Sequence, residues 1–158
     1  YKNKYFYLAV CATPLGQNGL GGHSHNDKLS YELWYDGKDY VKDPGTYLYT
    51  SLAERRNEFR STKAHKVPII NDMEQNELLK SQNSLFELFK NSEIKLLKLN
   101  KNEISLMLII KDIIFIRSFC LNNDTLKILD FMSKNTYKYI DFRLYSNGYG
   151  KLMKCSIV

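Results

Sequence analysis

The sequence predicts an all-β fold, an antiparallel β-sandwich, and three observations support it. Short apolar segments recur along the second half of the chain, separated by brief polar turns. Aromatic residues form 13% of the chain and, with many Ile, Leu and Val, favour strands over helices. Turns this short join neighbouring antiparallel strands. Because 44% of the 158 residues are hydrophobic, we expect one domain with its own core over residues 1–158.

The first half of the chain mixes strands with irregular segments. A strand is expected over Tyr5–Ala12, and the glycines at 16–22 then break any periodicity and predict a loop. Alternating apolar and polar residues over 28–35 predict a second strand. The later elements expected here are a hairpin turn at Asp36-Gly37, a short helix over Ser51–Phe59 and a strand over His65–Ile70.

The second half is expected to consist of strands almost throughout. Turns such as Asn100-Lys101-Asn102 are too short for anything but antiparallel neighbours. The expected strands are Ser84–Phe89, Ile94–Leu99, Ile104–Ile110, Ile113–Cys120, Thr125–Met132 and Tyr137–Tyr145.

Charge and cysteine content set broad limits on function. The formal charge of +6 favours polyanionic partners, whether nucleic acid, anionic lipid or acidic polysaccharide, or else serves only solubility. No segment approaches the ~20 apolar residues of a membrane span. Cys11, Cys120 and Cys155 form no Cys-x-x-Cys pair, so we interpret them as structural or incidental. A start at Tyr1, without Met or a signal peptide, predicts a fragment of a longer chain.

All three histidines lie in or between three short strings rich in Gly, Asp or Ser/Thr. The strings are Gly21–Asp27, Asp43–Thr46 and Ser61–His65. In a strand, side chains two positions apart share a face but are separated by roughly 6.5 to 7 Å. His23 and His25 could therefore share a pocket without both reaching one metal ion.

His25, Asp43 and His65 form the candidate metal-ligand set. Two neutral imidazoles and a carboxylate suit Zn²⁺, or another divalent cation, with water in a fourth position. The spacing differs from a zinc finger, so the metal would join segments of a sheet that folds largely by itself. The alternative interpretation is structural, with the histidines in a loop and a strand and Asp43 capping a turn.

Read in order, these strings resemble the C-terminal β-sandwich domain of the heparinase II/III-like polysaccharide lyases. The matching segments are Gly22–Leu33, Asp43–Thr50 and Glu54–His65, and the resemblance covers about residues 20–76. It implies that His25, Asp43 and His65 match the metal ligands of the family. It also implies that His23 matches an imidazole of the catalytic cleft.

The resemblance carries further expectations for the whole protein. Such lyases couple a helical α/α toroid to the sandwich, so we expect the N-terminal helical domain of the same chain as a partner. It implies an acidic polysaccharide as substrate, rather than nucleic acid or a membrane. It also implies a bacterial source and a periplasmic or secreted location.

The reaction expected of such an enzyme is β-elimination across C4 and C5 of a uronic acid. It requires a base for the weakly acidic C5 proton, neutralisation of the adjacent carboxylate and protonation of the leaving oxygen. His23 could act as the base or help to neutralise the carboxylate. A tyrosine on the helical domain is expected to complete the pair. The candidate substrate-binding residues are Tyr47, Tyr49, Arg55, Arg56 and Arg60, with packing or solvated surface as the alternative.

Two other function classes remain open at this stage. One is a non-catalytic, metal-stabilised carbohydrate-binding module. The other is a cupin-like metalloenzyme, in which His23, His25, Glu32 and His65 would form an iron site.

Overall fold

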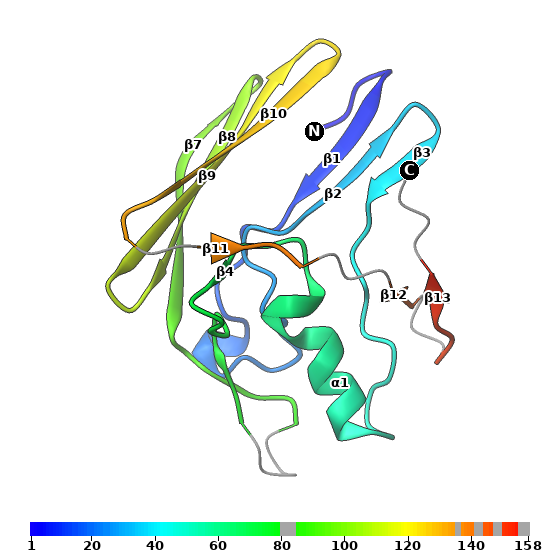
Figure 1. Cartoon of the computed structure of the whole chain (residues 1–158), viewed down its shortest axis with the longest axis vertical. Helices are drawn as coiled ribbons and strands as arrows, with labels where there is room; N and C mark the ends of the chain where they lie inside the picture. Colours follow the sequence, from blue (N-terminus) through cyan, green and yellow to red (C-terminus); the bar gives the residue numbers. More distant parts are fainter. Residues whose placement is uncertain (80–84, 135–136, 141–143, 147–149, 155–158) are drawn as a thin grey trace.

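Two antiparallel sheets face each other in the computed structural model, which describes residues 1–79, 85–134, 137–140, 144–146 and 150–154 (Figure 1). The first sheet has the order β1 (Phe6–Val10), β2 (Tyr31–Tyr35), β3 (Lys38–Val41). The second has the order β10 (Thr125–Met132), β9 (Ile113–Asn122), β8 (Glu103–Ile110), β7 (Ser92–Asn100). This arrangement confirms the predicted antiparallel β-sandwich.

The core lies between the two sheets and follows from the alternation along β9. Every second residue of this strand from Ile113 to Leu121 is buried, as expected where side chains alternate between faces. Phe119 is fully buried against Phe6 and Leu8 of β1, and its ring meets Tyr31 of β2 edge-on at 5.4 Å. Burial of these apolar side chains holds the two layers together.

Arg117 is the charged exception on the inward face of β9, and it links the sandwich to the loops. Its guanidinium makes a two-bond pair with Asp130 of β10, with both distances at 2.9 Å. Nη1 also donates to the backbone carbonyls of Leu29 (2.9 Å) and Lys66 (3.2 Å). These carbonyls follow two of the three sequence strings, so Arg117 fixes both strings to the same strand.

Smaller elements complete the described chain. A single α-helix, α1 (Ala53–Arg60), falls close to the predicted helix. Short antiparallel pairs join β4 (Ile69–Ile70) to β11 (Tyr137–Lys138), β5 (Glu77–Leu78) to β6 (Leu88–Phe89), and β12 (Leu144–Tyr145) to β13 (Met153–Lys154). Two 3₁₀ turns, η1 (Gln17–Gly19) and η2 (Thr62–Ala64), flank the segments that carry the histidines. Neither the α-helix nor these turns has the length and apolar character to span a membrane.

Several predicted elements are shorter than expected. The strand predicted over His65–Ile70 is reduced to β4, because η2 precedes it and the Val67 N–H donates to the His65 carbonyl at 2.9 Å. The segment predicted over 137–145 forms only β11 and β12, and residues 141–143 lie outside the described chain. The hairpin turn at Asp36-Gly37 is confirmed, with positive φ at both residues, as a type I′ turn requires.

A buried network of polar side chains ties the string at 21–27 to the segment 74–76. The Asn26 amide nitrogen donates to Glu74 (2.8 Å) and to the Asn76 carbonyl (2.7 Å). The Asn26 side-chain oxygen accepts hydrogen bonds from the backbone and side-chain nitrogens of Asn76. The side-chain oxygen of Asn76 in turn accepts a hydrogen bond from the Ser92 hydroxyl. Asn26 and Asn76 are both 0% exposed, so each bond is made where water cannot replace it.

Asn76→Ala should lower the free energy of unfolding by about 2–5 kcal/mol, because several buried partners lose their bonds at once. Denaturant unfolding measures this change. Asn102→Ala, at an exposed turn, is the matched control and should change the value by less than about 0.5 kcal/mol. Equal effects of the two substitutions would contradict the importance of the network.

Candidate functional site

Residues 21–27, which we call the histidine loop, form an irregular segment rather than the strand considered from the His-x-His spacing. Gly21 begins it with φ of 73°, and a Cβ there would lie 2.8 Å from Leu88 of β6, so only glycine fits. His23 also has a positive φ, 62°, and its N–H donates to the Phe86 carbonyl. The loop therefore turns sharply and places His23 at the surface.

His23 is exposed and pairs with a tyrosine from a distant part of the chain. Its Nδ1 is hydrogen-bonded to the Tyr49 hydroxyl at 2.5 Å, and the two rings are nearly parallel with centroids 5.7 Å apart. Phe86 packs against both rings, 5.2 Å from His23 and 5.1 Å from Tyr49. The imidazole thus belongs to a cluster of three rings, and its hydrogen bond to Tyr49 and its two aromatic contacts hold its orientation.

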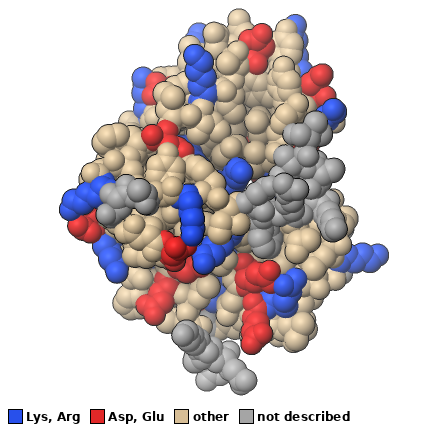
Figure 2. Space-filling view, viewed as in Figure 1, with Lys and Arg blue, Asp and Glu red and all other residues tan. Residues whose placement is uncertain are grey.

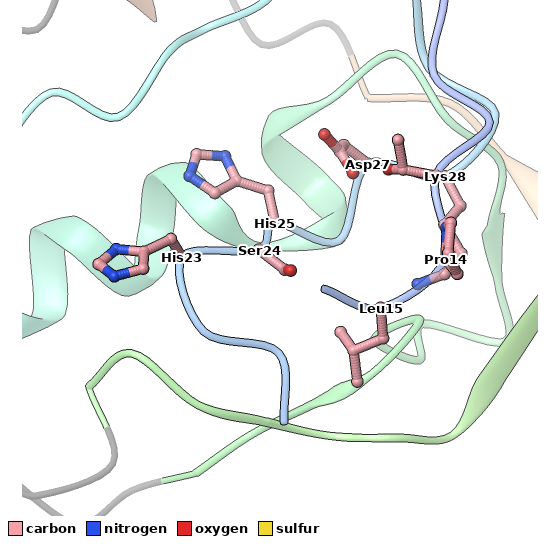
Figure 3. Close-up of a pocket in the computed structure, with 8 residues that line it drawn as sticks. Pro14, Leu15, His23, Ser24, His25, Asp27 and Lys28 are labelled. Carbon is pink, nitrogen blue, oxygen red and sulfur yellow. The ribbon is translucent and has the colours of Figure 1, made fainter. Parts of the chain in front are cut away.

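A polar cavity of about 360 Å³ lies beside the histidine loop (Figure 3). His23 and His25 line it from the loop, and Pro14 and Leu15 line it from the opposite segment. Cavities of this size are usual for small-molecule groups. The structure therefore provides a space into which a ligand group could enter next to His23.

The three predicted metal ligands lie together, although they come from segments far apart in the sequence. The rings of His25 and His65 are 5.3 Å apart between centroids. His65 Nδ1 is hydrogen-bonded to Asp43 Oδ2 at 2.8 Å, and Asp43 Oδ1 accepts from the Gly45 N–H at 2.9 Å. The turn after Asp43 thus fixes the direction of its carboxylate.

The electrostatic state of this group suits a divalent cation. Burial, followed by the neighbouring His65, lowers the pKa of His25 to about 4, so its imidazole is neutral near pH 7. Burial raises the pKa of Asp43, but the hydrogen bonds from His65 and Gly45 outweigh it and leave that pKa below its ordinary value. The result is a neutral imidazole beside an ionised carboxylate.

The donor atoms of this group are of the types that bind a metal ion, but their arrangement is not that of a metal site. His65 Nε2 is buried and has no hydrogen-bond partner among the described residues, which is unusual for a buried polar atom. Asp43 instead bonds to the other nitrogen of the ring. Within the described residues, no group of three or more His, Cys, Asp or Glu side chains has an arrangement that could hold a metal ion.

Tyr47 and Tyr49, predicted as substrate-binding residues, lie in a segment without regular structure. Tyr47 has φ of 61°, so an alternating strand is impossible there. Its half-buried ring packs against Phe59 (5.1 Å) and under the Arg55 guanidinium (5.4 Å). Tyr49 alone reaches the cavity region, through its hydroxyl on His23.

The three arginines predicted to bind substrate separate into two environments. Arg55 pairs with Glu58 on the surface of α1. Arg56 and Arg60 face inward and are 1% and 0% exposed, so the alternative that they form solvated surface is wrong for both. Arg56 stacks over Tyr49 (4.9 Å) and Phe86 (4.5 Å). In the part of the chain that the structure describes, Nη1 of Arg56 and both Nη atoms of Arg60 have no hydrogen-bond partner.

The net positive charge is therefore partly internal. Lysines and arginines are interspersed with acidic residues on the face shown in Figure 2, without one broad basic patch. Lys28, Arg56, Arg60 and Arg117 are each no more than 2% exposed. Composition alone could not distinguish surface charge from buried charge.

Lys28 and Phe86 are site residues that the sequence patterns did not identify. The alternation over 28–35 placed Lys28 on the polar side of a strand, but the strand begins only at Tyr31. Leu29 has φ of 70°, which breaks the alternation and turns Lys28 inward.

Glu32, the carboxylate of the cupin-like alternative, accepts a hydrogen bond from the Asp43 backbone N–H.

Comparisons with known proteins agree with this architecture. A solved heparinase III, the BT4657 gene product with methylated lysines, is 26% identical with a TM-score of 0.56. The alignment covers 80% of this chain and 18% of that one. The heparan sulfate lyase HepC from Pedobacter heparinus is 17% identical with a TM-score of 0.52, over 78% of this chain and 18% of HepC.

The chain thus spans only 18% of the length of these two solved structures. A search of curated protein sequences found no match. The sequence model described as "Heparinase II/III-like, C-terminal" matches residues 1–102, which include the histidine loop, Asp43 and His65. The chain therefore belongs to the heparinase II/III-like C-terminal family.

Proposed function

We propose that the protein cleaves an acidic, uronate-containing polysaccharide by β-elimination, and that this domain forms one wall of the active site. The observation that carries the proposal is the exposed His23, held by Tyr49 at the rim of a polar cavity. Membership of a heparinase II/III-like family and likeness to a heparinase III support this choice of substrate class.

The geometry at His23 suits proton transfer. Nδ1 is occupied by the Tyr49 hydroxyl, while Nε2 has no hydrogen-bond partner among the described residues. When Nδ1–H donates to the Tyr49 hydroxyl oxygen, Nε2 carries the lone pair that can take the C5 proton of a uronate. In the other tautomer, or in the protonated ring, Nε2–H can instead donate to the uronate carboxylate. As the C4–O bond breaks, the leaving oxygen must receive a proton from an acid. We propose that this acid lies on the N-terminal helical domain of the same chain.

We further propose that His25, Asp43 and His65 hold a divalent cation, which the donor set suggests is zinc. The gathered side chains, the neutral imidazole of His25 and the unpartnered Nε2 of His65 support this proposal. The cation would neutralise the half-buried carboxylate of Asp43 and hold the histidine loop to the segments around residues 43 and 65. Such a role fixes the position of His23 without involving the metal in the reaction.

The size of a polysaccharide suggests where the enzyme acts. Long anionic chains do not cross a bilayer unaided. We therefore propose a periplasmic or secreted location in a bacterium.

His23→Asn in the full-length protein should reduce kcat at least about 100-fold, because the proton-transfer group is lost. Asparagine is the suitable replacement, because it tolerates the positive φ of 62° at this position. The absorbance of the unsaturated uronate product measures turnover. Leu20→Ala, an exposed change just before the loop, is the control and should keep full activity.

Unchanged turnover in His23→Asn would show that this imidazole is not part of the chemistry. A full-length protein that binds the polysaccharide but never cleaves it would instead be a carbohydrate-binding module. Affinity measured beside turnover separates the two results.

His25→Ala and Asp43→Ala should each remove the bound metal and lower the melting temperature by several degrees, because binding stabilises the folded state. Metal content by mass spectrometry and thermal unfolding with and without chelator provide the measurements. His23→Asn, in the same loop, should keep its metal. Full metal content in both His25→Ala and Asp43→Ala would disprove the ligand assignment.

A further inference from the structure

The cavity beside His23 contains a lysine that the proposed chemistry does not use. Lys28 lines it together with His23, His25 and Asp27 (Figure 3). The residue is 2% exposed, which is rare for lysine. A side chain of this kind is usually at the surface, so its position needs a physical reason.

The backbone of Lys28 is held on both sides by one buried glutamine. Its N–H donates to Gln75 Oε1 at 3.0 Å, and its carbonyl accepts from Gln75 Nε2 at 2.9 Å. Gln75 is 0% exposed, so water does not compete for these bonds. The Lys28 backbone is therefore held in place, and the starting point of its side chain is fixed.

The Lys28 ammonium has no ion pair or side-chain hydrogen bond among the described residues. The neighbouring Asp27 attracts it electrostatically, but no carboxylate oxygen of the described chain lies within ion-pair distance. Burial lowers the pKa of Lys28, as expected for an ammonium removed from water. A buried charge without a partner costs several kcal/mol, so an anion in the cavity would relieve this cost.

We propose that Lys28 binds an anionic group of the substrate, a carboxylate or a sulfate, in the cavity next to His23. The inference rests on the proposed function and specifies how the substrate is recognised. An ammonium is a compact point charge with three donors and is suited to either oxyanion. His23 and Lys28 line the same cavity, so binding there would place the charged sugar beside the imidazole.

Lys28→Met tests this role in the full-length protein, because methionine keeps much of the apolar stem and removes the charge. We expect KM to rise at least about tenfold with little change in kcat, because the bound substrate and the transition state lose the same charged hydrogen bond. Lys28→Arg should recover most of the affinity. Lys101→Met, an exposed turn residue, makes the same change in charge outside the cavity and should have no effect.

Binding is measured separately from cleavage. Calorimetry in the His23→Asn background uses a heparan sulfate tetrasaccharide and its fully desulfated counterpart. Weaker binding of both probes by Lys28→Met supports a carboxylate contact, and weaker binding of the sulfated probe alone supports a sulfate contact. Unchanged affinity for both, or no affinity in the His23→Asn parent, overturns the proposal.

Two further measurements separate a failure of this inference from a failure of the proposed reaction and from a purely structural role of Lys28. If the full-length protein with His23 unchanged binds the polysaccharide but does not cleave it, the proposed reaction is refuted. The role of Lys28 in binding would still stand. If Lys28 were only structural, Lys28→Met would lower the melting temperature and Lys28→Arg would not restore affinity. We expect the melting temperature of Lys28→Met to stay the same or rise, because an unpaired buried charge is removed.

Discussion

The buried hydrogen bonds around Asn26 and Asn76 are the constraint on which the site depends. The histidine loop has no strand partner, so its polar groups need other partners inside the protein. Side-chain amides supply them, and Glu74 connects the loop to Thr62 through two more short bonds. One network therefore fixes the loop and the segment that leads to His65. A loop held in this way can position an imidazole about as firmly as a strand can.

Arg117 extends the same principle from the loops to the sandwich. Its pair with Asp130 stays inside the second sheet. Its Nη1 donates to carbonyls that follow the histidine loop and His65, and its Nη2 also donates to the Tyr139 hydroxyl. A buried arginine is tolerated when its donors are satisfied. Arg117 meets this condition, whereas Arg56 and Arg60 have guanidinium nitrogens with no partner in the described chain.

The division of labour follows from this arrangement. The sheets supply a rigid base through apolar packing. Irregular segments supply the histidines, Asp43 and Tyr49, while α1 supplies the three candidate arginines. His23 and Tyr49 meet across 26 positions of sequence, and His65 meets Asp43 across 22. Loops on a packed scaffold commonly carry function, because their backbone is free to adopt the conformations a site requires. The positive φ values at His23 and Tyr47 are examples.

The sequence by itself determined the sandwich, the strands β7–β10, the hairpin at Asp36-Gly37 and the three strings that contain the histidines and Asp43, because alternation and turn chemistry are local properties. Only the tertiary structure decided that Tyr49 meets His23, that Tyr47 packs away from the cavity and that Arg56 turns inward. It also decided the burial of Lys28, since one positive φ at Leu29 shifts the register and no composition or periodicity reports that angle. Register and burial depend on which distant segments meet, and that is settled only when the chain packs.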